Sequence, residues 1–236
     1  MDISFETNIR EWTAWMTDLE RNQLPFATAL ALTNTANGLR EYHRDLLPII
    51  FDRPTRFTMN SLRVTPATKA SPVASVWFKD SARAQSHYLL PQVEGGGRPL
   101  KRFEKWLVNR GLMSASERAV PAKGLRLDAY GNISAGTITQ ILSQLAASPD
   151  AHQWETARSR KRAGPQRARY FVPRQPGLPR GVWRRQGKKL EPVLIFVSTV
   201  SYQARYHFFD LSNAYANAHF PRNFADAMAR AIATAR

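Results

Sequence analysis

The chain has 236 residues, 43% of them hydrophobic, so it can bury a sizeable core in one large domain or two small ones. It contains no cysteine, which excludes disulfides, cysteine metal ligands and a cysteine nucleophile. The formal net charge of +16 is typical of proteins that contact nucleic acid or acidic surfaces.

The start of the chain predicts two helices. In residues 3–20, apolar side chains recur at steps of four and three, as on one face of an amphipathic helix. A second helix is expected over residues 25–46, beginning at a proline that suits a first turn. The apolar stripe of the first helix is formed by Phe5, Ile9, Trp12, Met16 and Leu19.

The first residues include acids and no apolar leader, and no apolar run approaches the roughly 20 residues of a membrane helix. We therefore expect a soluble protein that is made in the cytoplasm.

A turn and a β-hairpin are predicted next. Residues 52–55 contain a proline that interrupts the preceding helix. Residues 61–68 and 73–79 are rich in β-branched and aromatic side chains, and the polar residues 69–72 between them have hairpin length.

A glycine-rich loop follows the hairpin. Three successive glycines permit positive φ and close backbone approach, but they lack the spacing of a phosphate-binding P-loop. The loop is interpreted either as a contact with another subunit or as an internal tight turn. Its candidate contact residues are Tyr88, Glu94, Gly95, Gly96 and Gly97.

The middle of the chain predicts a helix over residues 99–110 that ends before Gly111, a short irregular or strand-like piece at 119–127 and a turn at 128–132. Ser134 is placed to cap a further helix. The expected later elements are strands at residues 169–172, 181–184 and 192–200 and helices at 207–218 and 223–234.

This order favours an α+β fold with a mainly antiparallel sheet, an N-terminal helical segment and C-terminal helices. We expect one domain with four parts. They are N-terminal helices (1–50), hairpin and helices (51–150), a basic Pro/Gly-rich excursion (151–190), and core strand with C-terminal helices (191–236).

The excess positive charge lies in one segment. Residues 158–189 contain 12 Lys or Arg and no Asp or Glu, while the rest has 22 basic and 18 acidic residues, a net charge of +4. Frequent Pro and Gly argue against one long regular element, and residues 158–169 are expected to form an exposed, mobile arm. The candidate partner or DNA contacts are Arg158, Arg160, Lys161, Arg162, Arg167 and Arg169.

Three interpretations of this arm stay open. Its arginines can neutralise DNA phosphates nonspecifically, dock on acidic surfaces of neighbouring subunits, or lie in solvent without a partner. The five histidines are scattered without metal-ligand spacing, and no nucleophile motif or nuclease acid pair is present. We expect no catalytic residue, metal or cofactor.

Several segments of this sequence, in this order, resemble the phage and prophage minor tail protein Z family, over roughly residues 25–215. The segments are FDRPTRFTMNSLRVTPATK, VWFKD, HYLLPQVEGGGRPLKRFEKWL, LDAYGNISAGTITQILSQL, YFV, GLPRGVW and PVLIFV.

The resemblance implies a virion structural protein without enzymatic activity, assembled in the host cytoplasm. Members of the family resemble tail-completion or neck proteins of lambda-like phages, which form a ring, commonly a hexamer, between head connector and tail tube. The implied partners are other copies of the chain, the adjacent connector and tail proteins, and packaged double-stranded DNA by nonspecific contact. The alternative function is that of a soluble, nonspecific DNA-binding protein that uses the basic segment.

Overall fold

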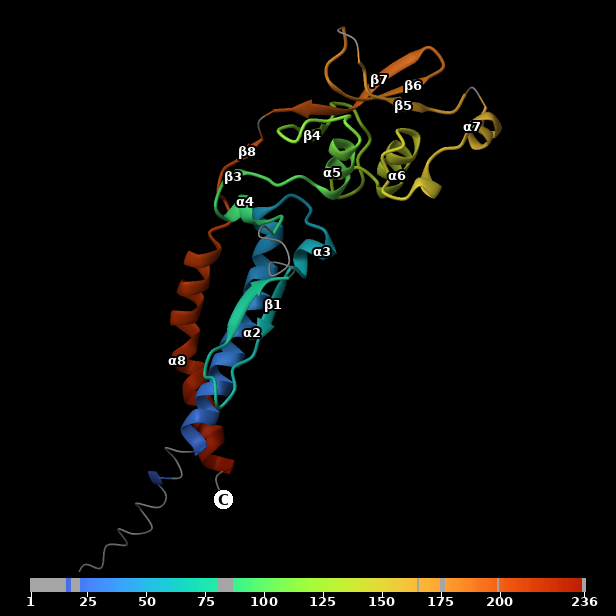
Figure 1. Ribbon diagram of the computed structural model, residues 1–236. Helices are drawn as coiled ribbons and strands as arrows, with labels where there is room; N and C mark the ends of the chain where they lie inside the picture. The colour runs from blue at the N-terminus through green and yellow to red at the C-terminus, as the bar shows by residue number, and fades with distance from the viewer. Residues whose placement is uncertain are drawn as a thin grey trace, which may run out of the picture. The chain divides into compact units, whose positions relative to one another are not determined.

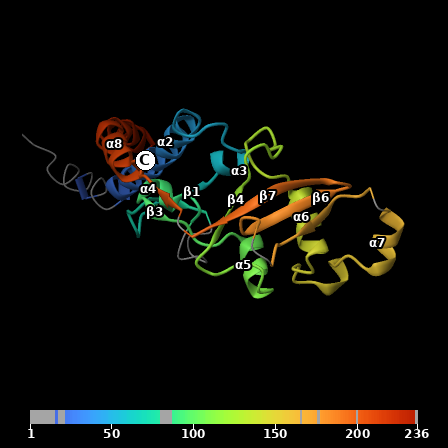
Figure 2. The same ribbon diagram turned by 90° about the horizontal axis from the view of Figure 1, so that it is seen from above.

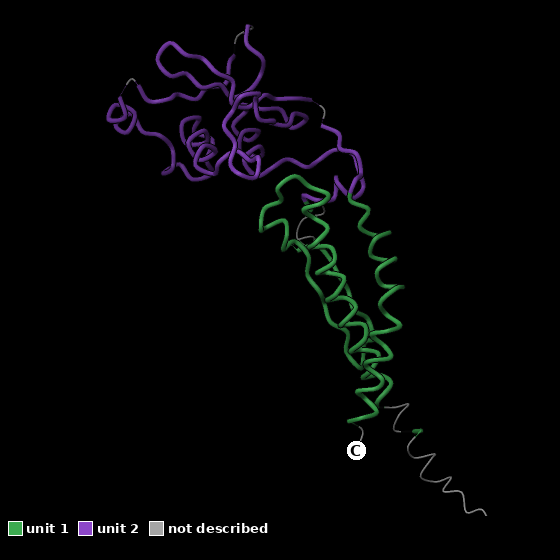
Figure 3. Tube along the Cα trace, turned by 180° about the vertical axis from the view of Figure 1, so that it is seen from behind, with its two compact units in different colours: residues 1–87, 206–236 green, residues 88–205 purple. Residues whose placement is uncertain are grey.

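The computed structural model describes residues 16–17, 22–79, 87–164, 166–174, 177–198 and 200–234. Helices combine with antiparallel strand pairs, which confirms the predicted α+β fold. The residues group into two compact units, 1–87 with 206–236 and 88–205 (Figure 3). The single domain expected from the sequence stays a prediction, which one cooperative unfolding transition would support.

The helices are α2 (Leu24–Ile50), α3 (Arg56–Met59), α4 (Leu90–Val93), α5 (Arg102–Asn109), α6 (Ala135–Gln144), the 3-10 turn η2 (Ala151–Gln153), α7 (Ala157–Ala163) and α8 (Phe208–Thr234). The strands are β1 (Leu62–Thr65), β2 (Ser75–Phe78), β3 (Gly96–Gly97), β4 (Arg118–Pro121), β5 (Arg169–Phe171), β6 (Gly181–Gln186), β7 (Lys189–Val197) and β8 (Ser201–Tyr202).

In the first unit, the long helices α2 and α8 lie side by side and run in opposite directions (Figures 1 and 3). Small side chains bring the two backbones close together, because Ala27 and Ala31 of α2 are buried against Ala227 and Ala231 of α8. At Gly38, an added Cβ would lie 2.4 Å from the Tyr215 hydroxyl oxygen. Gly38, a residue of weak helix propensity in the middle of α2, is therefore explained by close packing.

The C-terminal helix differs from the prediction of two helices. Residues 208–234 form one helix that passes through Pro221. An interior proline costs a helix about 3 kcal/mol. Phe220 and Phe224 flank the proline and pack on the buried alanines of the α2 and α8 contact, which offsets that cost.

The predicted hairpin is confirmed. Strands β1 and β2 pair antiparallel with Leu62 opposite Phe78, and both side chains are buried. Helix α2 extends beyond the predicted end to Ile50, and the expected turn follows it. The first predicted helix, residues 3–20, lies outside the described residues except for Met16 and Thr17, which are helical.

A fully buried histidine anchors α2 to α8. The His43 ring stacks on Phe208 with the ring centroids 4.6 Å apart. Ser212 Oγ donates its hydrogen to the Phe208 carbonyl oxygen, so it accepts from His43 Nε2, 2.8 Å away. The Tyr206 hydroxyl then donates to Nδ1 at 3.0 Å. This arrangement fits the neutral imidazole, and burial lowers the His43 pKa to about 4.

Because of His43, the free energy of unfolding is expected to decrease as the pH is lowered. Its pKa is lower in the folded state than in the unfolded state, so between about pH 6.5 and pH 4 the unfolded chain binds the extra proton. The stabilisation is fully present above pH 6.5, and about 3 kcal/mol of unfolding free energy is lost by pH 4. Urea unfolding at both pH values should show a smaller loss for His43→Gln. His152→Gln, at an exposed position, serves as the control. If all three proteins lost the same unfolding free energy between pH 6.5 and pH 4, the effect could not be assigned to His43.

The second unit is built on a four-stranded antiparallel sheet in the order β4-β7-β6-β5. Helices α5 and α6 pack against it (Figures 1 and 2), and their Leu107 and Ile141 join Val182 of β6 and Leu194 of β7 in the core. In β7, consecutive residues point to opposite faces, yet Val193 and Leu194 are both buried. The prediction that this strand is covered on both faces is confirmed.

Local sequence explains how these elements are joined. Strand β7 begins at Lys189, three residues earlier than predicted, because Pro192 lies at an irregularity opposite Trp183. Gly181 is required at the sheet, since an added Cβ would lie 2.1 Å from the Leu194 carbonyl oxygen. The predicted cap of α6 is confirmed, because Ser134 Oγ accepts from the Thr137 amide.

Candidate functional site

A buried glutamate organises the first half of the basic segment. The Glu155 side chain is 4% exposed, and its backbone amide donates to the Ser143 carbonyl oxygen at the end of α6. Its Oε2 lies 2.7 Å from Arg169 Nη1 and 3.2 Å from Arg160 Nε. Its Oε1 lies 3.2 Å from Arg167 Nη1, an ion pair without hydrogen-bond geometry. Three of the six candidate arginines and lysines are therefore held by one acid.

The chain around these pairs is more ordered than the arm expected over residues 158–169. Thr156 Oγ1 accepts from the Ser159 amide and caps α7, and Gly164 ends the helix with φ +73°. After this helix the chain enters β5 at Arg169. As predicted, the segment forms no single long regular element, but its first half contains a capped helix and a shared buried acid. The mobility expected of residues 158–169 stays a prediction.

The other three candidates form a separate basic face. Arg158, Lys161 and Arg162 are exposed, and in the described part of the chain none of their side chains has a hydrogen bond or ion pair. Their spacing of three and four residues places them on one side of α7. Arg160 lies on the opposite side, toward Glu155. We call Arg158, Lys161 and Arg162 the α7 basic face.

Acids outside the segment neutralise more of its charge. Glu117 binds Arg180 through two hydrogen bonds of 2.8 and 3.0 Å, and Glu191 pairs with Arg184 and Lys189. These acids lie outside residues 158–189, so the segment looked uncompensated in the sequence. The sequence analysis missed Glu117, Glu155 and Glu191 as partners, since only the fold brings them to the arginines.

Replacing the shared acid should loosen α7. Glu155→Gln keeps the size of the side chain but removes the charge that three guanidinium groups share, at an expected cost of about 1–3 kcal/mol. Amide hydrogen exchange within α7 should accelerate roughly tenfold or more, because 1.4 kcal/mol corresponds to a factor of ten. Glu191→Gln should leave exchange in α7 unchanged. Equal exchange in both variants would contradict the anchoring role of Glu155.

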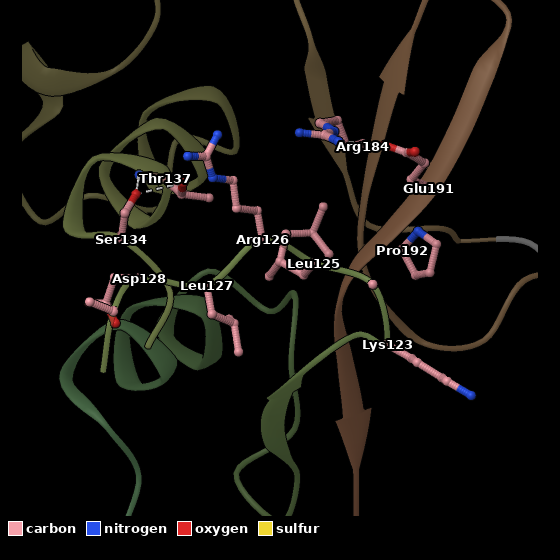
Figure 4. Close-up of a pocket in the computed structure, with 13 residues that line it drawn as sticks. Lys123, Leu125, Arg126, Leu127, Asp128, Ser134, Thr137, Arg184, Glu191 and Pro192 are labelled. Atoms are coloured by element: carbon pink, nitrogen blue, oxygen red, sulfur yellow. Dashed lines mark hydrogen bonds and ion pairs between the residues drawn. The ribbon is translucent and has the colours of Figure 1, made fainter. Parts of the chain in front are cut away.

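A cavity of about 670 Å³ lies between the first turn of α6, the 123–129 loop and strands β6 and β7. Figure 4 shows Arg126 between Thr137 on one side and Arg184 on the other. Arg184 is paired with Glu191, and the hydroxyls of Ser134 and Thr137 lie 2.9 Å apart. Asp128 accepts from two amides of its own turn. Of the charged groups around this cavity, Lys123 and Arg126 have no side-chain hydrogen bond or ion pair in the described chain.

The glycine-rich loop is used within the second unit. Gly95 and Gly96 have φ of +80° and +83°, and β3 pairs antiparallel with β8. An added Cβ at Gly95 would lie 3.3 Å from the Tyr202 carbonyl oxygen. The glycines are therefore required by an internal turn, one of the two interpretations of the loop. Tyr88 and Glu94 are exposed, and their contact with another subunit stays a prediction.

The structure brings three arginines of the basic segment to one acid, and it places two of the histidines in one aromatic cluster through Phe208 and Phe78. His43 and His87 are buried in the first unit, His152 and His219 are exposed, and no described residues form a group of three or more potential metal ligands. Among the helices of the described ranges, none is both long and apolar enough to cross a membrane.

Comparison of the chain with models of protein families, with curated proteins and with solved structures returned no match.

Proposed function

We propose that this chain is a structural protein of a phage virion, a minor tail or tail-completion protein that assembles as a ring at the head-tail junction. It joins the tail to the DNA-filled head without making or breaking a covalent bond. The partners are other copies of the chain and the adjacent connector and tail rings, with nonspecific contact to packaged DNA.

The α7 basic face is the observation that carries the proposal. Arg158, Lys161 and Arg162 project from a capped helix whose opposite side is tied to Glu155. The supporting helix limits the entropy lost when the three side chains bind a partner. Guanidinium groups pair well with carboxylates, which favours an acidic face of a neighbouring ring as that partner.

The pairing of the basic segment also suits a ring through which DNA passes. A lumen that carries unpaired arginines and lysines over its whole surface would hold DNA tightly at low salt. Here Arg160, Arg167 and Arg169 share Glu155, Arg180 pairs with Glu117, and Arg184 and Lys189 share Glu191. Three acids thus lower the positive charge of this segment. The described basic residues of the segment without an ion pair are the three of the α7 basic face and Arg174, Arg185 and Lys188, so half of this unpaired charge is concentrated on one face, as directional docking requires.

The proposal is tested by producing particles without the chain. DNA-filled heads and separate tails should accumulate, and adding purified protein to the mixture should join them. Joined, infectious particles in the absence of the chain would overturn the proposal.

The α7 basic face also supports the alternative, a soluble protein that binds DNA nonspecifically. If three side chains each neutralise a phosphate, the logarithm of the binding constant should fall with the logarithm of salt concentration with a slope of about −2.7. Reversing the three charges should abolish this slope in the isolated protein. Binding of this kind by a chain that is absent from virions would favour the alternative.

A further inference from the structure

An apolar groove runs along the first unit between α2, β2 and α8. Its volume is about 490 Å³. Leu32 and Leu39 come from α2, Val76 from β2, and Phe208 and Phe220 from α8. The polar groups beside the groove are few, so it suits an apolar side chain better than an ion or a sugar.

Phe209 lies in this groove with 61% of its surface exposed. A large aromatic side chain next to an apolar groove is typical of a surface that another chain covers. Burying a phenylalanine side chain stabilises a contact by about 1.5–3 kcal/mol. Phe209 is therefore a strong candidate for the centre of an interface.

The segment before α2 has the matching chemistry. Residues 3–20 carry the apolar stripe of Phe5, Ile9, Trp12, Met16 and Leu19. A helix of 18 residues is about 27 Å long, and the α2 part of the groove, from Leu32 to Leu39, spans about 10 Å. One such helix can lay two or three apolar side chains into the groove, with Trp12 near its middle.

We propose that residues 3–20 of a second copy of this chain fill the groove with their apolar stripe. Asn22 and Gln23 continue the helical conformation of α2 toward the N-terminus, so the chain does not begin to turn back at these residues. The inference rests on the proposed ring function and deepens it by naming the subunit contact.

Exchange of this segment makes a head-to-tail contact. Each copy presents one segment and one groove, so the two contacting surfaces differ, and repetition closes into a ring where the rotation permits. The contact uses no residue of the α7 basic face. Subunit association and docking on an adjacent ring are therefore separable by mutation.

The experiment uses two full-length variants and measures mass in solution by sedimentation. The first, Phe209→Glu, blocks the groove at an exposed position. The second carries Ile9→Asp and Trp12→Asp and blocks the segment. Native protein should form oligomers, and each variant alone should stay at the 26.7 kDa of one chain. An equal mixture of the two variants should form a dimer of twice that mass, in which the native segment of one variant fills the native groove of the other. This dimer cannot add a third copy, because its unoccupied groove carries Phe209→Glu and its unoccupied segment carries the two Asp substitutions.

Ile49→Glu is the matched control, since Ile49 is an exposed apolar residue of the same unit outside the groove, and it should associate like the native chain. A mixture that remains monomeric, or a native chain that is monomeric at every concentration, would overturn the inference. If the pair forms but the chain is absent from the neck, the proposed function fails and the exchange stands. If the chain lies in the neck and the pair does not form, only the exchange fails.

Discussion

Replacing Arg158, Lys161 and Arg162 together by Glu should lower the yield of infectious particles at least about a hundredfold, because breaking charge pairs across an interface costs about 2–5 kcal/mol for each buried pair. All three side chains are exposed and make no contact that holds α7 in place. Because Glu in the last turn of α7 opposes the helix dipole, the free energy of unfolding should fall by about 1–2 kcal/mol at most. Plaque titre and urea unfolding of the purified chain measure the two effects.

The matched control carries the same change in net charge at Lys123, Arg174 and Lys188, which are exposed basic residues of the same unit. Its titre should stay within a few fold of that of the native protein. A normal titre for the α7 variant would remove the role proposed for the basic face. An equal loss for both variants would show that the total charge matters and that its position does not.

Replacing Glu104 by Ala should lower the free energy of unfolding by about 3–5 kcal/mol, since its removal leaves the charge of a largely buried arginine without its carboxylate partner. The Glu104 carboxylate is fully buried. It accepts from Arg98 at 2.6 and 2.7 Å, and from the amides of Lys101 at 2.6 Å and Ala119 at 2.8 Å. One side chain thus ties the start of α5 to β4.

The protonation state of Glu104 supports this expectation. Burial alone would raise its pKa, but the hydrogen bonds from Arg98 and from the two backbone amides outweigh burial and hold the pKa below the usual value. The carboxylate is therefore charged at neutral pH, and its loss removes the counter-charge of Arg98 and the acceptor of both amides.

Urea unfolding of Glu104→Ala measures the cost. Glu41→Ala is the control, because Glu41 is half-exposed and pairs with Arg40 and Arg44 on the surface of α2, where about 1 kcal/mol or less is expected. The double variant Glu104→Leu with Arg98→Met removes both charges and should recover part of the loss. A cost no larger than that of Glu41→Ala would contradict the account of the buried pair.

The elements with strong local signals were predictable from the sequence. The proline at the start of α2, the serine before α6, the glycine after α5 and the polar break of the hairpin each act within a few residues of the chain. Strand β7 was also predictable, since a continuous apolar run requires cover on both faces. These signals suffice for the α+β class.

The remaining features depend on contacts that are distant in sequence. Pro221 predicts a helix break, and only the packing of α8 on α2 overrides it. The ion pairs of the basic segment could not be predicted from the sequence, because the pairing of strands in the sheet brings Glu117 and Glu191 to its arginines. Glu155 precedes the arginines by a few residues, but its burial, which makes it a shared partner, follows from the position of α6.

The central claim is that this chain forms a ring at the junction of head and tail, and imaging of purified virions with and without the chain tests it most directly. Averaged images that resolve the neck from the tail tube should show added density as a ring at the junction, in several copies per particle. The α7 basic face should meet the adjacent ring. Particles whose neck is identical with and without the chain would contradict the claim and make DNA binding by the soluble protein the function to pursue.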